Sequence, residues 1–464
     1  MRDLKYIFYP KSVAVIGASR DPAKIGNVVL KNFVDGGFAG GIYPVNPAAD
    51  ELFGLKCYKS VMDIPGRVDS AVICIPAQHV PKALEECGRR GVKGVVVISG
   101  GFSEIGNYKL EQELVKIAKK YDMAVIGPNC LGVVNPAMKV DSIFLPTYKM
   151  GRPSVGGVSF VTQSGAVGST ILDLVAREGF GISKFVSYGN AAVVDETDIL
   201  EYLMKDKNTK IIVLYIEGVK RGKAFFEITR RVTKVKPIVV IKAGITEKGA
   251  AAAKSHTGSL AGSYAAYSAV FKQNHLIEAK SLDEVFDFAK IFNTQPLCTG
   301  DRVAVITNGG GMGVLAADAI VEKGLQLAEF SDETIKRIRE CMPPLVNATN
   351  PLDLVGDADA ARYEKAIDIV YNDPNVDALM VITLFQTVSL DSRVVDVVIK
   401  AAGRKEKPLL NITLGGEYTE MQRRALESSG VPSYSSPSAA ANALAKLVEY
   451  SRFRAKLKGG QKRR

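Results

Sequence analysis

The first candidate catalytic residue is a histidine within a segment of small residues. His256 lies in residues 243–263, where 13 of 21 residues are Gly, Ala or Ser, so no apolar stripe can pin the segment to a core. The motif Lys254-Ser255-His256-Thr257-Gly258 places a cation and hydroxyl groups beside the imidazole. A neutral imidazole nitrogen is a competent nucleophile toward phosphorus near pH 7. We predict that His256 is a catalytic residue on a mobile loop, whereas His79 and His275 are structural or solvent-facing.

Two glycine-containing helix starts are the predicted phosphate-binding elements. A phosphorylated imidazole needs N–H donors for its oxygens, and the first turn of a helix supplies them together with the positive end of the helix dipole. We predict that the two starts bind one phosphoryl group from two sides. Their residues are Ser164, Gly165 and Ala166 in the first and Asn308, Gly309, Gly310 and Gly311 in the second.

Glu217 directly follows the apolar run Ile211–Ile216. This run predicts a buried parallel strand, and ligands of open α/β sheets bind beyond the carboxyl ends of such strands. A carboxylate at this place can hold the second nitrogen of an imidazole and fix its tautomer. We predict that Glu217 is a second catalytic residue, and the alternative is a surface acid at a strand end.

Short apolar runs alternate with helical patterns along the chain, which predicts an α/β fold with parallel strands. Linkers rich in Pro and Gly divide the runs into three sets. The predicted domains are residues 1–145, 153–295 and 299–452, followed by a basic tail at 453–464. The predicted strands are residues 12–16, 41–45, 71–75, 95–98, 124–126, 158–162, 184–187, 211–216, 237–241, 303–307, 379–383 and 409–413, with a closing helix at 438–450.

The second and third sets begin alike. Residues 158–179 can be placed on residues 303–324 at a constant offset of 145, and six of the 22 positions are identical. The identical pairs are Val158/Val303, Thr162/Thr307, Gly165/Gly310, Gly168/Gly313, Asp173/Asp318 and Gly179/Gly324. This similarity predicts two related domains, each with a glycine-lined helix start.

The first set contains a strand, a glycine turn and a helix, an arrangement that binds phosphate groups. A nicotinamide-binding fingerprint would place Gly at positions 17, 19 and 22, but Ser19 and Pro22 stand at the last two of these positions. Asn46-Pro47 stands at the end of the second strand, where the acidic residue that binds the ribose is expected. Small residues at the other strand ends leave room for an elongated ligand such as coenzyme A, with its ADP end on the first loop. The predicted CoA-binding residues are Gly17, Ala18, Ser19, Lys24, Gly26, Asn46, Ile75, Pro76, Ser99, Gly100 and Asn129.

Composition excludes a disordered chain and disfavours a nucleic-acid-binding protein. The chain has 464 residues, which corresponds to about three domains at ~150 residues each, and 47% of its residues are hydrophobic. The net charge is +11, but seven positive charges lie in residues 452–464. The rest of the chain is therefore only mildly basic, which favours small anionic ligands over nucleic acid. We expect the basic end to be a frayed, solvated terminus.

Cysteine spacing and hydropathy limit the remaining choices. The six cysteines form no CxxC pair, so we expect neither a zinc ribbon nor a disulfide framework, and we predict no metal site in this chain. No run approaches roughly 18 apolar residues, and the start of the chain lacks the apolar stretch of a signal peptide. We predict a cytoplasmic protein that does not bind membranes.

The motif around His256, together with residues 161–168 (Val-Thr-Gln-Ser-Gly-Ala-Val-Gly), resembles the α subunit of ADP-forming acetyl-CoA synthetases. These enzymes belong to the nucleoside-diphosphate-forming acyl-CoA synthetase superfamily, which includes succinyl-CoA synthetase. The resemblance covers nearly all of residues 5–450. It implies a Rossmann-like CoA-binding domain followed by two flavodoxin-like ligase domains, with His256 as the phosphorylated residue. It also implies an ATP-grasp β subunit that binds ADP or ATP and Mg²⁺, in an α2β2 heterotetramer.

The resemblance further implies a reaction in three steps. Phosphate attacks an acyl-CoA such as acetyl-CoA to give an acyl phosphate and CoA, His256 takes the phosphoryl group and releases a small carboxylic acid, and the loop delivers the phosphoryl group to ADP. The sequence does not distinguish acetate from larger acids. Two other classes of protein stay open. One is a non-catalytic CoA-sensing scaffold, which would not need His256. The other is an NAD-dependent oxidoreductase, although the glycines and the acidic residue that would bind the dinucleotide are missing.

Overall fold

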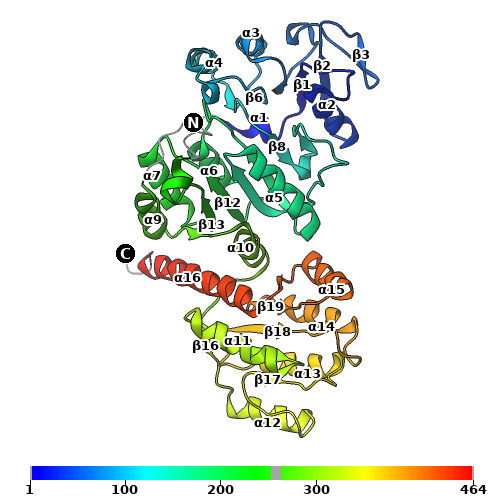
Figure 1. The fold of residues 1–464 in the computed structure, drawn as a ribbon, viewed down its shortest axis with the longest axis vertical. Coiled ribbons are helices and arrows are strands. Elements are labelled where there is room, and N and C mark those ends of the chain that lie inside the picture. Colours follow the sequence, from blue (N-terminus) through cyan, green and yellow to red (C-terminus); the bar gives the residue numbers. More distant parts are fainter. Residues whose placement is uncertain (1–2, 252–262, 462–464) are drawn as a thin grey trace. The chain divides into compact units, whose positions relative to one another are not determined.

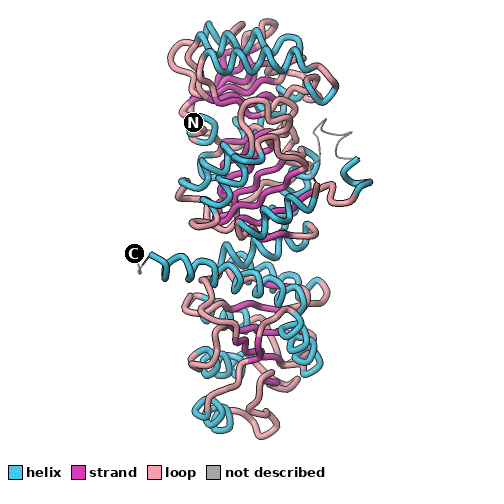
Figure 2. The backbone as a smooth tube through the Cα atoms, turned by 90° about the vertical axis from the view of Figure 1, so that its left-hand side faces the viewer, coloured by secondary structure: helices cyan, strands magenta, loops and turns pink. Residues whose placement is uncertain are grey.

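The computed structural model describes residues 3–251 and 263–461 (Figure 1). The chain has an α/β fold that divides into two compact units. Unit 1 comprises Met1–Arg177 and Gly181–Lys280, and unit 2 comprises Glu178–Phe180 and Ser281–Arg464. Within each unit the strands lie between layers of helices (Figure 2).

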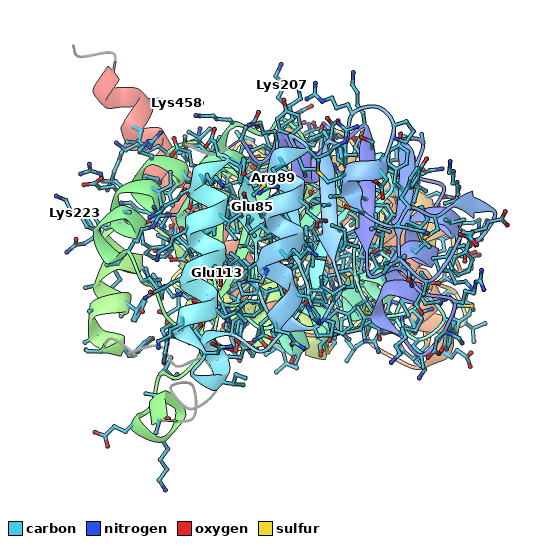
Figure 3. All side chains as sticks on the ribbon, turned by 90° about the horizontal axis from the view of Figure 1, so that it is seen from above. Glu85, Arg89, Glu113, Lys207, Lys223 and Lys458 are labelled. Carbon is cyan, nitrogen blue, oxygen red and sulfur yellow. The ribbon has the colours of Figure 1, made fainter. Side chains whose placement is uncertain are left out.

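The first sheet of unit 1 is parallel, and its strands are apolar because helices cover it. Its order is β2 (Gly41–Val45), β1 (Ser12–Ile16), β5 (Ser70–Ile73), β6 (Gly94–Val97) and β7 (Ala124–Ile126). The short strands β3 (Glu51–Leu52) and β4 (Leu55–Lys56) form a separate antiparallel pair. The helices are α1 (Lys5–Phe8), α2 (Ile25–Asp35), α3 (Val80–Arg89) and α4 (Tyr108–Lys120), of which α3 and α4 pack side by side. Charged side chains such as Glu85, Arg89 and Glu113 project from α3 and α4 (Figure 3).

The second sheet of unit 1 combines a parallel core with an antiparallel edge. Its order is β14 (Ile277–Glu278), β13 (Ile238–Lys242), β12 (Ile211–Ile216), β10 (Val155–Thr162), β11 (Ile182–Ser187), β8 (Gly132–Asn135) and β9 (Val140–Asp141). Strand β8 runs antiparallel to β11, with Val134 opposite Phe185. The helices are α5 (Gly165–Glu178), α6 (Glu196–Lys205), α7 (Gly222–Val232) and α9 (Tyr264–Gln273).

The sheet of unit 2 is parallel. Its order is β16 (Gln326–Leu327), β15 (Arg302–Thr307), β18 (Ala378–Ile382), β19 (Leu409–Ile412) and β20 (Ser433–Tyr434), and β17 (Leu352–Asp353) also pairs with β15. The helices are α10 (Leu282–Thr294), α11 (Gly310–Glu322), α12 (Asp332–Cys341), α13 (Ala360–Tyr371), α14 (Arg393–Ala402), α15 (Glu417–Ser428) and α16 (Pro437–Gln461). Helix α16 packs against α10 and α11, while α13 packs against α14.

The three sheets share one strand order. In each sheet the first parallel strand lies between the second strand and a later one, so β1 lies between β2 and β5, β10 between β11 and β12, and β15 between β16 and β18. This arrangement creates a topological switch point, where ligands of open α/β sheets bind. The helices that follow β10 and β15 begin at Gly165 and Gly310, 145 residues apart. The structure therefore confirms the predicted strands to within a few residues and both predicted helix starts.

The described part of the basic end, up to Gln461, differs from the expectation of a frayed terminus. Helix α16 continues to Gln461, and Arg452 forms an ion pair with Asp301. The apolar side chains that anchor this helix, such as Leu444 and Leu447, are fully buried, so its cationic part extends a helix that is already fixed.

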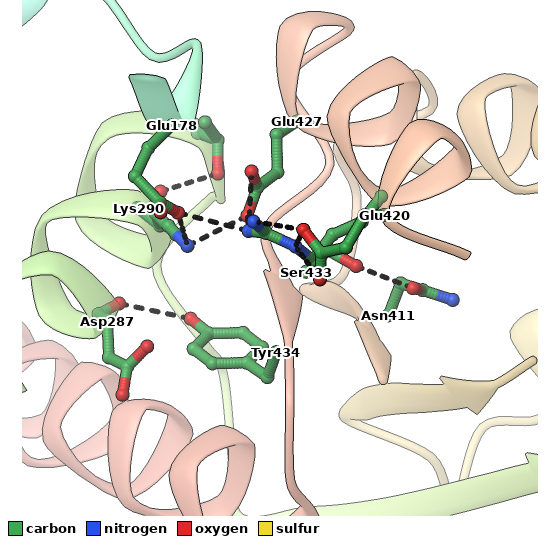
Figure 4. Close-up of polar contacts among 10 residues, drawn as sticks. Glu178, Asp287, Lys290, Asn411, Glu420, Glu427, Ser433 and Tyr434 are labelled. Carbon is green, nitrogen blue, oxygen red and sulfur yellow. Dashed lines mark hydrogen bonds and ion pairs between the residues drawn. The ribbon is translucent and has the colours of Figure 1, made fainter. Parts of the chain in front are cut away.

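A buried ion network holds unit 2 together (Figure 4). Lys290 of α10 lies 2.9 Å from Glu178 and 2.8 Å from Glu427 of α15. Arg423 binds the same two carboxylates at 3.0 and 2.9 Å. The side chain of Glu427 is only 2% exposed, so each cation compensates charge that water cannot reach.

Lys290→Met is expected to destabilise unit 2 by about 3–5 kcal/mol, the cost of leaving buried carboxylates without one of their cations. Denaturant unfolding followed by circular dichroism measures the shift. The control is Lys400→Met, because Lys400 and Glu364 form an exposed pair that contributes about 0–1 kcal/mol. A shift for Lys290→Met no larger than that of the control would contradict the role given to the network.

Candidate functional site

A cavity of about 460 Å³ lies in unit 1, where the first sheet's carboxyl edge meets the start of α5. Ile98 and Asn129 line it from the first sheet, and Ser164, Gly165 and Ala166 line it from the β10–α5 turn. The structure therefore brings together one predicted CoA-binding residue and three predicted phosphate-binding residues. The other predicted CoA-binding residues are not among those that line this cavity.

The start of α5 presents its backbone to the cavity. Ser164 is buried, and its hydroxyl accepts a hydrogen bond from the N–H of Val167 at 3.3 Å, as in a helix N-cap. Gly165 has no side chain to cover the first N–H groups, and an added Cβ would lie 3.6 Å from Leu131, an ordinary contact. The helix start therefore offers N–H groups and a positive dipole end to an anion in the cavity.

Gln163 lies at the topological switch point of the second sheet. Its side-chain oxygen accepts hydrogen bonds from the N–H groups of Glu217 and Gly218 at 2.8 and 3.1 Å, which joins the ends of β10 and β12. Asn308 occupies the equivalent position 145 residues later. Its side-chain oxygen accepts from the N–H of Leu384 at 3.0 Å, which joins the ends of β15 and β18. The same amide connection therefore recurs at both switch points.

The Asn308 side chain is fully engaged within unit 2. It also donates to the Leu384 carbonyl at 3.1 Å and accepts from the Tyr363 hydroxyl at 2.9 Å. An anion at this helix start would therefore meet the backbone of Gly310 and Gly311 rather than the Asn308 amide. An added Cβ at Gly311 would have no neighbour within 4 Å, which leaves this turn open.

Glu217 is 6% exposed, which excludes the alternative of a surface acid. The Tyr215 hydroxyl donates to its carboxylate at 3.4 Å, and the Lys242 ammonium donates to its backbone carbonyl at 2.8 Å. Burial lowers the pKa of Lys242, and the Glu217 carboxylate opposes that shift. The carboxylate therefore lies beside a buried cation at the carboxyl edge of the second sheet.

A second acid, Glu196, lies in the same part of unit 1. It is the first residue of α6 and is 1% exposed, and its neighbours include the fully buried Tyr188. Burial raises the pKa of Glu196 to about 7, and the adjacent Asp195 carboxylate adds to the rise. Asp195 itself stays ionised: although burial opposes this, its contacts with Arg221 lower its pKa.

Glu196→Gln is expected to flatten the pH dependence of stability. Folded Glu196 holds a proton up to about pH 7, whereas the unfolded carboxyl loses it near its ordinary pKa of 4.5. Folding stability therefore falls as pH rises through this window, by up to about 3 kcal/mol at 1.36 kcal/mol per pKa unit. Urea unfolding at pH 5 and pH 8 measures the change. Glu113→Gln, at an exposed position of α4 (Figure 3), is the control. The same change in unfolding free energy between pH 5 and pH 8 in wild type and Glu196→Gln would contradict the prediction.

The first predicted CoA-binding turn is built around two glycines in close contact. Gly17 has a φ of +89°, and a Cβ at Gly26 would lie 1.9 Å from the Gly17 carbonyl oxygen. The helix α2 is thus packed directly against the turn. Asn46 holds the turn from the next strand, because its amide donates to the Ala18 carbonyl at 2.7 Å. Ser19 accepts from the N–H of Asp21 at 3.1 Å, and Lys24 is the exposed N-cap of α2.

The remaining predicted CoA-binding residues form the other turns of this edge. Ser99 donates to the Ile75 carbonyl at 2.5 Å, and the N–H of Asn129 donates to the Ser99 carbonyl at 2.9 Å. Pro76 is exposed, and Gly100 lies beside Asn129. These bonds connect the ends of β5, β6 and β7 into one continuous surface.

Asn190 and Lys220 also line the cavity, although neither was predicted as a site residue. The Asn190 amide donates to Glu104 at 2.6 Å and to Glu111 at 2.9 Å, which fixes it against the turn after β6. Lys220, three residues after Glu217, donates to the Asn190 carbonyl at 2.7 Å. Neither residue belongs to a recognisable motif: Asn190 and Lys220 follow β11 and β12 of the second sheet, and Asn190 also contacts a turn of the first sheet.

The Cys130 thiol and the imidazoles of His79 and His275 are not catalytic candidates in the cavity. Cys130 lines it, but burial raises the pKa of its thiol to about 12, so the thiolate nucleophile is scarce. His79 and His275 are exposed, as expected.

Among residues 3–251 and 263–461, no three His, Cys, Asp or Glu side chains are grouped to hold a metal ion. No helix in the same residues is long and apolar enough to cross a membrane.

His256 and its motif lie outside the described residues. The described chain leaves β13 at Lys242, on the edge that carries Glu217, and α9 begins at Tyr264. The role predicted for His256 therefore stays a prediction.

Three family models match the chain in sequence order. They describe a CoA binding domain at residues 11–136, a succinyl-CoA ligase like flavodoxin domain at 155–292 and a ligase-CoA domain at 303–451. With the cavity at the edge of the first domain, these define a protein of the succinyl-CoA synthetase-like superfamily.

Curated relatives narrow the class. The chain is 45% identical over 458 residues to acetate–CoA ligase [ADP-forming] of Methanocaldococcus jannaschii, a match that covers 98% of this chain and 64% of that protein. It is 44% identical over 465 residues to subunit alpha of acetate–CoA ligase [ADP-forming] I of Pyrococcus furiosus, covering 98% and 99%. The chain thus belongs to the family of ADP-forming acetyl-CoA synthetases, of the alpha-subunit type, and spans about 64% of the length of its longer relatives.

Solved structures agree with this assignment. The dinucleotide forming acetyl-coenzyme A synthetase 1 of Ca. Korarchaeum cryptofilum, in complex with phosphate and ADP, matches with a TM-score of 0.92 and 40% identity over 99% of both chains. PH0766 from Pyrococcus horikoshii matches with a TM-score of 0.88 and 40% identity, over 97% of this chain and 100% of that one.

Proposed function

We propose that this chain is the alpha part of an ADP-forming acyl-CoA ligase. The reaction converts an acyl-CoA, ADP and phosphate into a carboxylic acid, ATP and CoA. The observation that carries the proposal is the cavity in which Asn129 of the CoA-binding domain faces the first turn of α5. A ligand lying along the first sheet's edge can place its reactive end beside a helix start that binds anions.

The first step takes place in this cavity. CoA lies on the turns from Gly17 to Asn129, with its thioester group in the cavity, and inorganic phosphate lies at the N–H groups of Gly165 and Ala166. A phosphate oxygen attacks the acyl carbon, the carbon–sulfur bond breaks, and CoA leaves as a thiol with the proton of the phosphate. The protein contributes positioning and charge stabilisation, which account for much of the rate in such transfers.

The second step uses His256. Its imidazole nitrogen attacks the phosphorus of the acyl phosphate, and the carboxylic acid leaves. Glu217 accepts a hydrogen bond from the other ring nitrogen, which fixes the tautomer and stabilises the positive ring. The burial of Glu217 supports this role, because a carboxylate screened from water interacts more strongly with a cation.

The last step requires a partner. An ATP-grasp subunit would bind ADP and Mg²⁺, receive the phosphoryl group from His256, and assemble with this chain as an α2β2 heterotetramer. Two supports are the name of the P. furiosus relative, which is a subunit alpha, and the greater length of the M. jannaschii relative. Phosphate and ADP are bound in the Korarchaeum protein.

Release of CoA tests the proposal most simply. The chain is mixed with acetyl-CoA and phosphate, free thiol is measured, and acyl phosphate is trapped with hydroxylamine. We expect CoA release that depends on phosphate and matches the acyl phosphate formed. A CoA-sensing scaffold would bind acetyl-CoA by calorimetry and release no thiol, which would contradict the proposal.

A further inference from the structure

The cavity in unit 1 contains a cation that no step described above uses. Of the described residues that line the cavity, Lys220 is the only one with a formal charge. It lies in the turn between β12 and α7 and lines the same cavity as Ser164 and Gly165. The reaction concentrates negative charge in this space, because phosphate and acyl phosphate are both anions.

The Lys220 ammonium is held in place by the backbone. Its nitrogen lies 2.7 Å from the Asn190 carbonyl oxygen and 3.5 Å from that of Ala191. The Asn190 side chain is itself fixed by Ser103 at 3.2 Å and by Glu104 at 2.6 Å. An ammonium group has three N–H donors, so Lys220 can keep both carbonyl contacts and still donate to a ligand oxygen.

The position of Lys220 complements the helix start. Backbone N–H groups at Gly165 and Ala166 hold a phosphate by directional hydrogen bonds and a partial positive charge, whereas an ammonium supplies a full charge. Neither replaces the other, because a phosphate dianion needs more positive charge than one helix end provides.

We propose that Lys220 is a catalytic residue that binds an oxygen of inorganic phosphate in the cavity and keeps that contact while the acyl phosphate forms. This inference rests on the proposed function. In this step, HPO₄²⁻ and acyl-CoA give the acyl phosphate dianion and the CoA thiol. The bond between a phosphate oxygen and the acyl carbon forms as the carbon–sulfur bond breaks, and the phosphate proton goes to sulfur. Lys220 stays protonated throughout and lowers the energy of the negative charge on the phosphate.

Lys220→Met and Lys220→Arg in the full chain test the assignment. CoA release from acetyl-CoA is measured as a function of inorganic phosphate. For Lys220→Met we expect the KM for phosphate to rise by about 30-fold or more, the range for losing a charged contact, with the KM for acetyl-CoA changed less than about threefold. Lys220→Arg should recover most of the phosphate affinity, because the charge is retained. Lys223→Met, on the exposed side of α7 (Figure 3), is the control and should behave as wild type.

Two outcomes would overturn the inference. One is an unchanged KM for phosphate in Lys220→Met. The other is a loss of acetyl-CoA affinity equal to the loss of phosphate affinity, with no recovery in Lys220→Arg, which would identify Lys220 as a support for the Asn190 turn. If wild type itself releases no CoA, the proposed function fails, and calorimetric titration of inorganic phosphate into wild type and Lys220→Met still decides whether Lys220 binds it.

Discussion

His256→Ala is expected to abolish ATP synthesis from acetyl-CoA, ADP and phosphate when the chain is assayed with its ATP-grasp partner. The loss should exceed about 10³-fold, because the reaction loses the nucleophile that carries the phosphoryl group. The first step does not involve the imidazole, so CoA release in a single turnover should persist. Acyl phosphate should therefore accumulate, and hydroxylamine trapping measures it.

The control for this variant is His79→Ala. His79 is an exposed histidine of the CoA-binding domain, so its replacement tests for a general effect of losing an imidazole. We expect wild-type ATP synthesis from His79→Ala. ATP synthesis by His256→Ala at more than about a tenth of the wild-type rate would show that another group carries the phosphoryl group.

Gly165→Val is expected to reduce acyl phosphate formation by about 10²–10³-fold, the cost of removing backbone donors that stabilise a transition state. The space around Gly165 accepts a Cβ at 3.6 Å from Leu131, so the variant should fold while its methyl groups cover the N–H groups of the α5 start. Ser164→Ala should be milder, because it leaves those N–H groups in place. Thiol release under single-turnover conditions is the measurement.

Two further glycines make the comparison decisive. Gly222, the first residue of α7, also has open space around it, so Gly222→Val controls for a β-branched residue at a helix start and should leave thiol release unchanged. Gly311→Val tests the start of α11 in unit 2. It is preferable to Gly310→Val, because a Cβ at Gly310 would lie 2.6 Å from the Asp353 carboxylate. If Gly311→Val shows normal phosphoryl transfer to His256, both from ATP and from acyl-CoA with phosphate, the α11 start is a structural turn.

The strands and helix starts were predictable because they depend on local sequence. Runs such as Ile211–Ile216 are apolar throughout and end at a polar or small residue, and the structure places β12 at those residues. The two helix starts were equally accessible, because Gly165 and Gly310 follow such runs at the same spacing. Strands β8 and β9 were not predicted, since short edge strands have little periodicity and pair with a sheet that the chain forms later.

The cavity was only half predictable. Asn129 and Ser164 were predicted because each stands at a strand end, where ligands of α/β sheets bind. Lys220 and Asn190 were not, because their place in the cavity depends on contacts between residues far apart in the sequence: Lys220 binds the Asn190 carbonyl, and Asn190 binds Glu104 after the first sheet's β6. Glu196 gives no signal either, since only burial and its neighbour Asp195 raise the pKa of an otherwise ordinary carboxyl.

Direct labelling tests the central claim, that inorganic phosphate becomes a phosphoryl group on His256. The chain is incubated with acetyl-CoA and ³²P-phosphate without ADP, and the protein is then separated and digested. We expect close to one acid-labile label per chain on the peptide that contains His256, with no label in His256→Ala and little in Gly165→Val. Label on another peptide, or CoA release from wild type without any labelled protein, would contradict the account.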